Sequence, residues 1–152
     1  MSVIASVAVL IGVLALATIL GVLLRATTGR ATAVQTRATT VPRTAATADL
    51  APAEAFGTRA TLVQFSTPTC ARCPATRRQL DSVAAQHEGV ERLEIDLAER
   101  PDLARRFAVM QTPTVLLLDH HGVVRTRFGG PPRPPELAAA LDTVLSAHQE
   151  SR

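Results

Sequence analysis

The chain has 152 residues, of which 47% are hydrophobic and 19% are charged, and it carries a formal net charge of +3 at pH 7. These values are near the globular average, but the apolar residues and the positive charge are unevenly distributed. All sixteen basic residues are Arg, and the excess positive charge lies within residues 25–59. No aromatic residue lies among the four Arg residues between positions 25 and 43, which speaks against nucleic-acid binding.

A continuous run without charged residues extends over residues 3–24. Its 22 residues, at about 1.5 Å each, would form a helix as long as the hydrocarbon core of a bilayer is thick. A cleaved signal peptide is the alternative, but it requires a basic segment before a shorter apolar stretch and a small-residue cleavage site after it. Here no basic residue precedes the run, and Arg25 follows it directly. We therefore predict a single uncleaved transmembrane helix over residues 3–24.

The residues that follow the apolar run are strongly basic. Arg25, Arg30, Arg37 and Arg43 lie within about twenty residues of the run, the range over which the positive-inside rule counts, and no basic residue lies on the other side. This asymmetry predicts a single-pass protein of the cell membrane whose domain is cytoplasmic. The Arg residues are then expected to contact anionic lipid headgroups.

Residues 25–58 are rich in Thr, Ala and Arg and show no apolar periodicity that could bury a face. We predict a flexible tether whose ends would stand roughly 30 Å apart as a random coil. Residues 50–56 could add one turn to the domain that follows, although Pro52 and the short length of the segment argue against it.

From residue 60 onward the pattern becomes regular and predicts an α/β domain over residues 59–150. Apolar runs and alternation predict strands, and apolar residues recurring at helical spacing predict helices. Helices between strands imply parallel pairing, and the final hairpin adds an antiparallel edge. The expected order is β-α-β-α-β-β-α, a central mixed sheet flanked by helices, with strands over 61–65, 90–96, 114–118 and 123–128 and helices from the cysteines to about 88, from 101 through 107, and from 135.

The only two cysteines, Cys70 and Cys73, lie where the first strand gives way to a helix. Residues three apart on a helix are close enough for a disulfide. Cys73 precedes Leu80 by seven residues and so lies on the buried stripe, whereas Cys70 lies at the exposed amino-terminal tip. The helix N-terminus and the charge of Arg72 should both favour the thiolate of Cys70. We predict that Cys70 attacks a partner's disulfide and that Cys73 resolves the mixed disulfide.

A metal site and an inert structural pair are the alternatives for these cysteines. A zinc site would need two further ligands. The only other candidates that are clustered in the sequence are His120 and His121, which fall in an expected hairpin turn and are more simply explained as solvated residues. We therefore predict no metal site, and a metal-binding or scaffolding module remains the alternative from a different functional class.

The stretch from about residue 60 to 148 resembles the thioredoxin superfamily. The resemblance rests on the cysteine pair after a strand, on Thr112-Pro113-Thr114, and on Gly122 and Gly129 around the final strand. It implies a thioredoxin-like fold and a thiol-disulfide oxidoreductase that acts on protein thiols and disulfides without a bound cofactor. It also implies that Pro113 is cis, a state that is affordable mainly at X–Pro bonds, that it faces the disulfide, and that Thr112 binds the substrate backbone.

The chain also departs from the thioredoxin pattern. It has no Trp, it has Ala71-Arg72 between the cysteines, and Gln64 stands where the family has a buried Asp, so this side chain cannot exchange a proton. The usual first strand and helix have no convincing counterpart. We therefore expect a membrane-tethered oxidoreductase with a dedicated protein partner, and an extracytoplasmic reductase of exported proteins or apocytochrome is the alternative.

Overall fold

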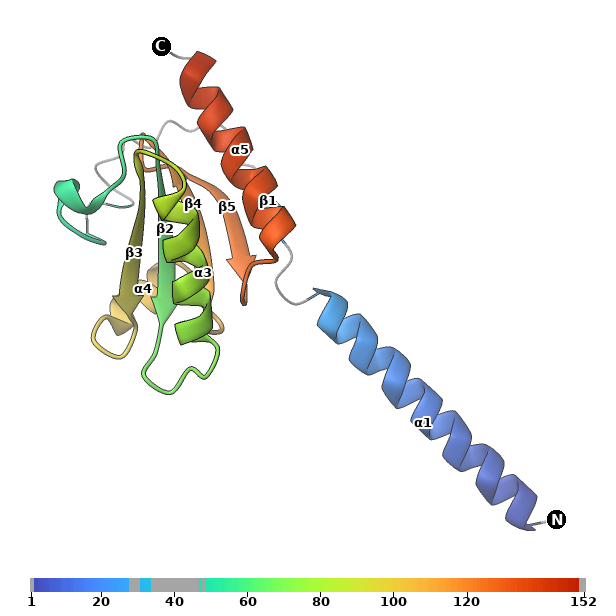
Figure 1. Ribbon diagram of the computed structural model, residues 1–152. Helices are drawn as coiled ribbons and strands as arrows, with labels where there is room; N and C mark the ends of the chain where they lie inside the picture. Colours follow the sequence, from blue (N-terminus) through green and yellow to red (C-terminus); the bar gives the residue numbers. More distant parts are fainter. Residues whose placement is uncertain (1, 28–30, 34–46, 48, 151–152) are drawn as a thin grey trace.

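The structure is a computed structural model that describes residues 2–27, 31–33, 47 and 49–150 (Figure 1). The order of elements predicted for residues 60–150 is confirmed, and each element lies within a few residues of its expected place. The strands are β1 (Ala31–Ala33), β2 (Ala60–Ser66), β3 (Val90–Asp96), β4 (Thr114–Asp119) and β5 (Val124–Gly129); the helices are α1 (Ser2–Thr27), α3 (Cys73–Ala85), α4 (Pro101–Arg106) and α5 (Pro134–Glu150), with a 3-10 turn, η1, at Ala53–Ala55.

Within the described residues, five strands form one mixed sheet in the order β1-β5-β4-β2-β3. β2 and β3 are parallel, as expected for strands joined by a helix, and β4 and β5 form the predicted antiparallel hairpin. The expectation that β4 would also be parallel is wrong, because β4 runs antiparallel to β2.

The helix between β3 and β4 is short, although 17 residues separate the two strands. This helix, α4, has six residues and is therefore about 9 Å long, whereas a seven-residue strand spans about 23 Å. The helix alone does not span the sheet, and β4 begins at the edge where β3 ends, antiparallel to β2. That edge also carries the carboxyl end of β2, which brings the loops after β2 and β3 close to the start of β4.

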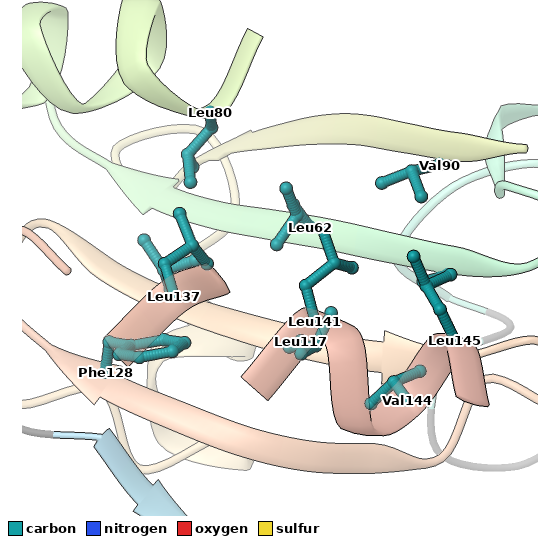
Figure 2. Packing of buried hydrophobic residues seen from close by; sticks show 11 residues of the cluster. Leu62, Leu80, Val90, Leu117, Phe128, Leu137, Leu141, Val144 and Leu145 are labelled. Carbon is teal, nitrogen blue, oxygen red and sulfur yellow. The ribbon is translucent and has the colours of Figure 1, made fainter. Parts of the chain in front are cut away.

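One face of the sheet is covered by α3 and α5. Leu80 of α3 and Leu137 and Leu141 of α5 are fully buried against Leu62 and Leu117 of the sheet (Figure 2). These helix residues recur at the spacing of an amphipathic stripe, so burying them attaches both helices along their length. α3 ends at Ala85 rather than near residue 88.

The other face of the sheet has a smaller core that includes part of the predicted tether. Val63 and Phe65 of β2 pack there with Leu103 of α4 and with Leu50. The segment around η1 therefore belongs to the domain, and β1 adds an antiparallel edge strand to β5. The extra turn considered for residues 50–56 is therefore present, and β1 lies within the expected flexible tether over residues 25–58. Most of the other residues of the tether lie outside the described part of the chain, and the tether stays a prediction.

α1 contains an 18-residue window, Ser6–Leu23, that is long and apolar enough to cross a membrane. None of this window is buried against the rest of the chain. A signal sequence near an N-terminus would meet the same criteria of length and composition. The predicted helix over residues 3–24 is thus confirmed as a helix, and its place in a membrane stays a prediction.

Candidate active site

Cys70 lies in the loop after β2, and Cys73 is the first residue of α3. The two sulfurs form a disulfide, and the Cα atoms are 5.5 Å apart. Cys73 is 4% exposed, whereas Cys70 is half-buried, so the first cysteine is the more accessible one, as predicted. Because α3 begins at Cys73, Pro74 falls in the first turn, where its missing N–H leaves no helical hydrogen bond unmade.

The loop that carries Cys70 is joined to the segment before β4. The hydroxyls of Thr67 and Thr112 share a hydrogen bond at 3.3 Å, which brings Thr112 beside the cysteine loop. The Thr112–Pro113 peptide bond is cis, as the resemblance predicted, and Pro113 is buried. The structure therefore brings together the two segments that the sequence singled out, 42 residues apart at Cys70 and Thr112.

The segment that leads to Thr112 is held from β5. Ala108 has a left-handed backbone with a φ of 47°, which is unusual for a residue other than Gly. Arg127 donates hydrogen bonds to the carbonyls of Phe107 at 2.6 Å and of Ala108 at 2.7 Å. These bonds satisfy carbonyls at the end of α4 and so fix where the chain leaves that helix.

Gln64 lies beneath the first turn of α3 and is completely buried. Its amide Nε2 donates to the carbonyl of Cys73 at 3.2 Å, while its Oε1 has no hydrogen-bond partner among the described residues. The side chain is neutral, so it holds the backbone at the second cysteine and does not take up or release a proton.

A groove of about 420 Å³ lies beside the disulfide, and we call it the disulfide groove. It follows the loop after β2, the first turns of α3 and the end of β3. Its lining includes both cysteines, three carboxylates and one guanidinium. These groups come from Cys70, Cys73, Arg77, Glu94, Asp96 and Glu99.

An ion network forms one wall of the groove. Arg77, on α3 one turn after Cys73, binds Oε1 of Glu94 at 2.7 Å, and Ser66 Oγ donates to the same oxygen at 2.9 Å. Arg92 binds Oε2 of Glu94 at 3.2 Å and also pairs with Asp81. Burial opposes the ionisation of Glu94, but the hydrogen bonds from Arg77 and Ser66 and the charges of Arg77 and Arg92 outweigh it, so its pKa lies below the ordinary value.

The sequence reasoning missed Arg77 and Glu94. The side chain of Arg77 is 51% exposed on the surface of α3, and it also lines the groove. Arg72, the predicted tuning residue, is exposed and is not among the groove-lining residues. The available signal was spacing: Arg77 follows Cys73 by four residues, which places the two side chains on one helix face.

Among the described residues, no group of three or more His, Cys, Asp or Glu side chains is arranged to hold a metal ion. The two histidines of the hairpin turn were expected to be solvated, but the ring of His120 packs against the rings of His121 and His148. Its centroid lies 3.7 Å from that of His121 and 4.4 Å from that of His148 on α5. This cluster follows the end of β4, at the opposite edge of the sheet from the disulfide.

Comparison with known proteins agrees with this geometry. The family model of the thioredoxin-like domain matches residues 47–145. The chain belongs to the thioredoxin-like family. It is 33% identical over 82 residues to a thioredoxin of Methanocaldococcus jannaschii, a match that covers 53% of this chain and 91% of that protein.

Solved structures of thioredoxins share the fold of this chain. Thioredoxin NaTrxh from Nicotiana alata superimposes with a TM-score of 0.51 at 27% identity, over 57% of this chain and 73% of its own. A mutant thioredoxin from Halobacterium salinarum superimposes with a TM-score of 0.51 at 20% identity, over 57% of this chain and 75% of its own. The family and the paired cysteines together support the class of thiol-disulfide oxidoreductases.

Proposed function

We propose that this protein is a membrane-tethered thiol-disulfide oxidoreductase that exchanges disulfides with a protein partner through Cys70 and Cys73. The observation that carries the proposal is the disulfide between a half-buried Cys70 and a buried Cys73 at the start of α3, in a thioredoxin-like domain. An accessible sulfur beside a protected one is the arrangement that two-step exchange requires.

The exchange proceeds through a mixed disulfide. In the reducing direction, the Cys70 thiolate attacks one sulfur of the partner's disulfide, and the partner's other sulfur leaves as a thiolate and takes up a proton. Cys73 then loses its proton and attacks Cys70, so the mixed disulfide breaks and the partner is released with two thiols. The Cys70–Cys73 disulfide is left behind, and a dithiol reductant restores the starting state.

The groups around the sulfurs have distinct roles in this proposal. Thr112 and Pro113 present the partner's chain beside Cys70, supported by the hydrogen bond between Thr67 and Thr112. Arg72, in the loop between the cysteines, adds a positive charge that favours the Cys70 thiolate. No bound cofactor is required, since the electrons pass between sulfur atoms.

α1 is the membrane anchor in this proposal, and the domain lies on the cytoplasmic side. Support comes from the length and apolar surface of α1 and from the Arg residues that follow it in the sequence. The Arg residues would then lie against anionic headgroups of the inner leaflet.

Trapping the mixed disulfide tests the exchange. Cys73→Ser in the full chain, expressed in its native membrane, should accumulate disulfide-linked partners that a reductant releases. Cys70→Ser, the matched control, should trap none, because it lacks the accessible sulfur. If Cys70→Ser traps the same partners equally well, the assignment of attacking and resolving cysteines is wrong. If neither variant traps a protein, the proposed exchange is wrong.

Thiol labelling in intact cells tests the side of the membrane. The reduced cysteines should resist a membrane-impermeant maleimide until the cells are broken open. Labelling of intact cells would instead support the extracytoplasmic alternative, a reductase of exported proteins or apocytochrome. Extraction of the protein by alkaline carbonate would contradict the membrane anchor itself.

A further inference from the structure

Two of the charged groups that line the disulfide groove form a pair of opposite sign. Arg77 of α3 and Glu94 of β3 line the disulfide groove together with Cys70 and Cys73, and they bind each other at 2.7 Å. Glu94 is the more buried partner, with 19% of its side chain exposed against 51% for Arg77. Its position is fixed further by Ser66 and Arg92, so its charge is held at a defined place beside the sulfurs.

Such fixed charges act differently on the two redox states. The disulfide is uncharged, whereas reduction adds two electrons, breaks the S–S bond and leaves Cys70 as a thiolate while Cys73 takes up one proton. A nearby positive charge therefore stabilises the reduced state and a nearby negative charge destabilises it. The charges along the groove therefore shift the reduction potential of the disulfide.

We propose that Arg77 and Glu94 are positioning residues that set the reduction potential of the Cys70–Cys73 disulfide with opposite signs. Arg77 raises the potential by stabilising the thiolate. Glu94 lowers it, both through its own charge and by drawing the guanidinium of Arg77 to itself. The inference rests on the proposed function and adds to it the groups that decide how strongly the protein reduces or oxidises its partner.

Other charged groups around the sulfurs also act on the reduction potential. Asp96 and Glu99 also line the groove and act in the same direction as Glu94. Asp81 of α3 pairs with Arg92, which links α3 to β3 a turn further from the cysteines. Arg72 is exposed to solvent, where salt screens its charge most effectively.

The chain offers a matched control for each member of the pair. Arg78 is the next residue of α3; it is exposed and does not line the groove. Glu91 lies three residues before Glu94 on β3, so its side chain points to the opposite face of the sheet. Substitution of either control removes the same charge from the same element, away from the disulfide.

The test measures the potential of the full chain, in detergent micelles at low ionic strength, against glutathione redox buffers. Glu94→Gln should shift the equilibrium toward the dithiol by about threefold to tenfold, and a tenfold shift corresponds to about 30 mV. Arg77→Met should shift it toward the disulfide by a similar factor. The pKa of the Cys70 thiol, followed by thiolate absorbance, should fall in Glu94→Gln and rise in Arg77→Met. Arg78→Met and Glu91→Gln should leave both quantities within twofold of wild type.

A purely structural ion pair predicts a different result. Both variants would then lower the free energy of unfolding, while the potential and the thiol pKa would stay at wild-type values, and this outcome overturns the inference. Shifts of the same sign in both variants overturn it as well. If the wild-type disulfide does not equilibrate with glutathione at all, the proposed function fails, and the inference falls with it.

Discussion

The two sides of the disulfide differ in their chemistry. On the groove side lies a charged wall, which we define as Arg77, Glu94, Asp96 and Glu99. On the side of β4 lies a neutral rim, defined as Thr112 and Pro113, which the hydrogen bond between the hydroxyls of Thr112 and Thr67 joins to the cysteine loop. Charges act on the sulfurs through space, whereas a neutral surface can contact a partner's chain without the cost of desolvating ions. The wall is therefore suited to tuning the sulfurs and the rim to binding.

The largest effect, on the free energy of unfolding, is expected for α3, the helix that carries Arg77 of the charged wall. Leu80 of α3 is fully buried against the sheet, so Leu80→Ala should lower the free energy of unfolding by about 2–5 kcal/mol. Urea unfolding of the oxidised protein measures this change. Arg78→Ala, on the exposed face of the same helix, should change it by less than about 0.5 kcal/mol. Equal effects of the two substitutions would show that α3 is not held through its buried stripe.

The neutral rim is tested next by removing a hydroxyl. Thr112→Val keeps the shape of the side chain but removes its hydrogen bond to Thr67. Loss of one hydrogen bond, worth about 1 kcal/mol, should lower kcat/KM for reduction of a protein disulfide by about threefold to tenfold. The glutathione equilibrium should not change, because no charge near the sulfurs is altered. Thr69→Val, an exposed residue of the cysteine loop that carries Thr67, is the control. A shift in potential without a change in rate would reverse the roles assigned to rim and wall.

The charged wall should also make stability depend on pH. The pKa of Glu94 in the folded protein lies below its ordinary value, so Glu94 contributes stability that is present above the unfolded-state pKa of about 4.5. This contribution is lost as the pH falls through the lower folded-state pKa. Relative to wild type, Glu94→Gln should therefore be less stable by about 1 kcal/mol or less at pH 7, and the difference should shrink as the pH falls below about 4.5. Urea unfolding across this range, with Glu91→Gln as control, checks the sign; a difference that grows as the pH falls would contradict it.

The smallest effect is expected for Arg72. Its side chain is exposed and lies outside the wall, so Arg72→Met should shift the glutathione equilibrium toward the disulfide by less than about threefold. The shift should shrink further in 0.5 M salt, unlike that of the more protected Glu94. A larger shift than that of Arg77→Met would place the main tuning charge between the cysteines rather than in the groove.

Local patterns were sufficient to predict the elements of the domain and the two cysteines. Apolar periodicity depends on neighbours within a turn or two, so β2, α3 and α5 were found within a few residues. The spacing of Cys70 and Cys73 at a strand-to-helix junction predicted both the disulfide and which sulfur is more accessible. The direction of β4 was missed, because the 17 residues before it are enough for either direction and no local pattern distinguishes the two.

The sequence by itself thus determined the order of elements, the apolar helix and the paired cysteines, since each depends on residues close together in the chain. Only the tertiary structure decided which groups surround the sulfurs. The contact of Arg77 with Glu94 joins residues 17 apart, and that of Thr67 with Thr112 joins residues 45 apart. Such contacts arise because β3 and the start of β4 meet at the edge of the sheet where β2 ends, and no local pattern encodes that meeting.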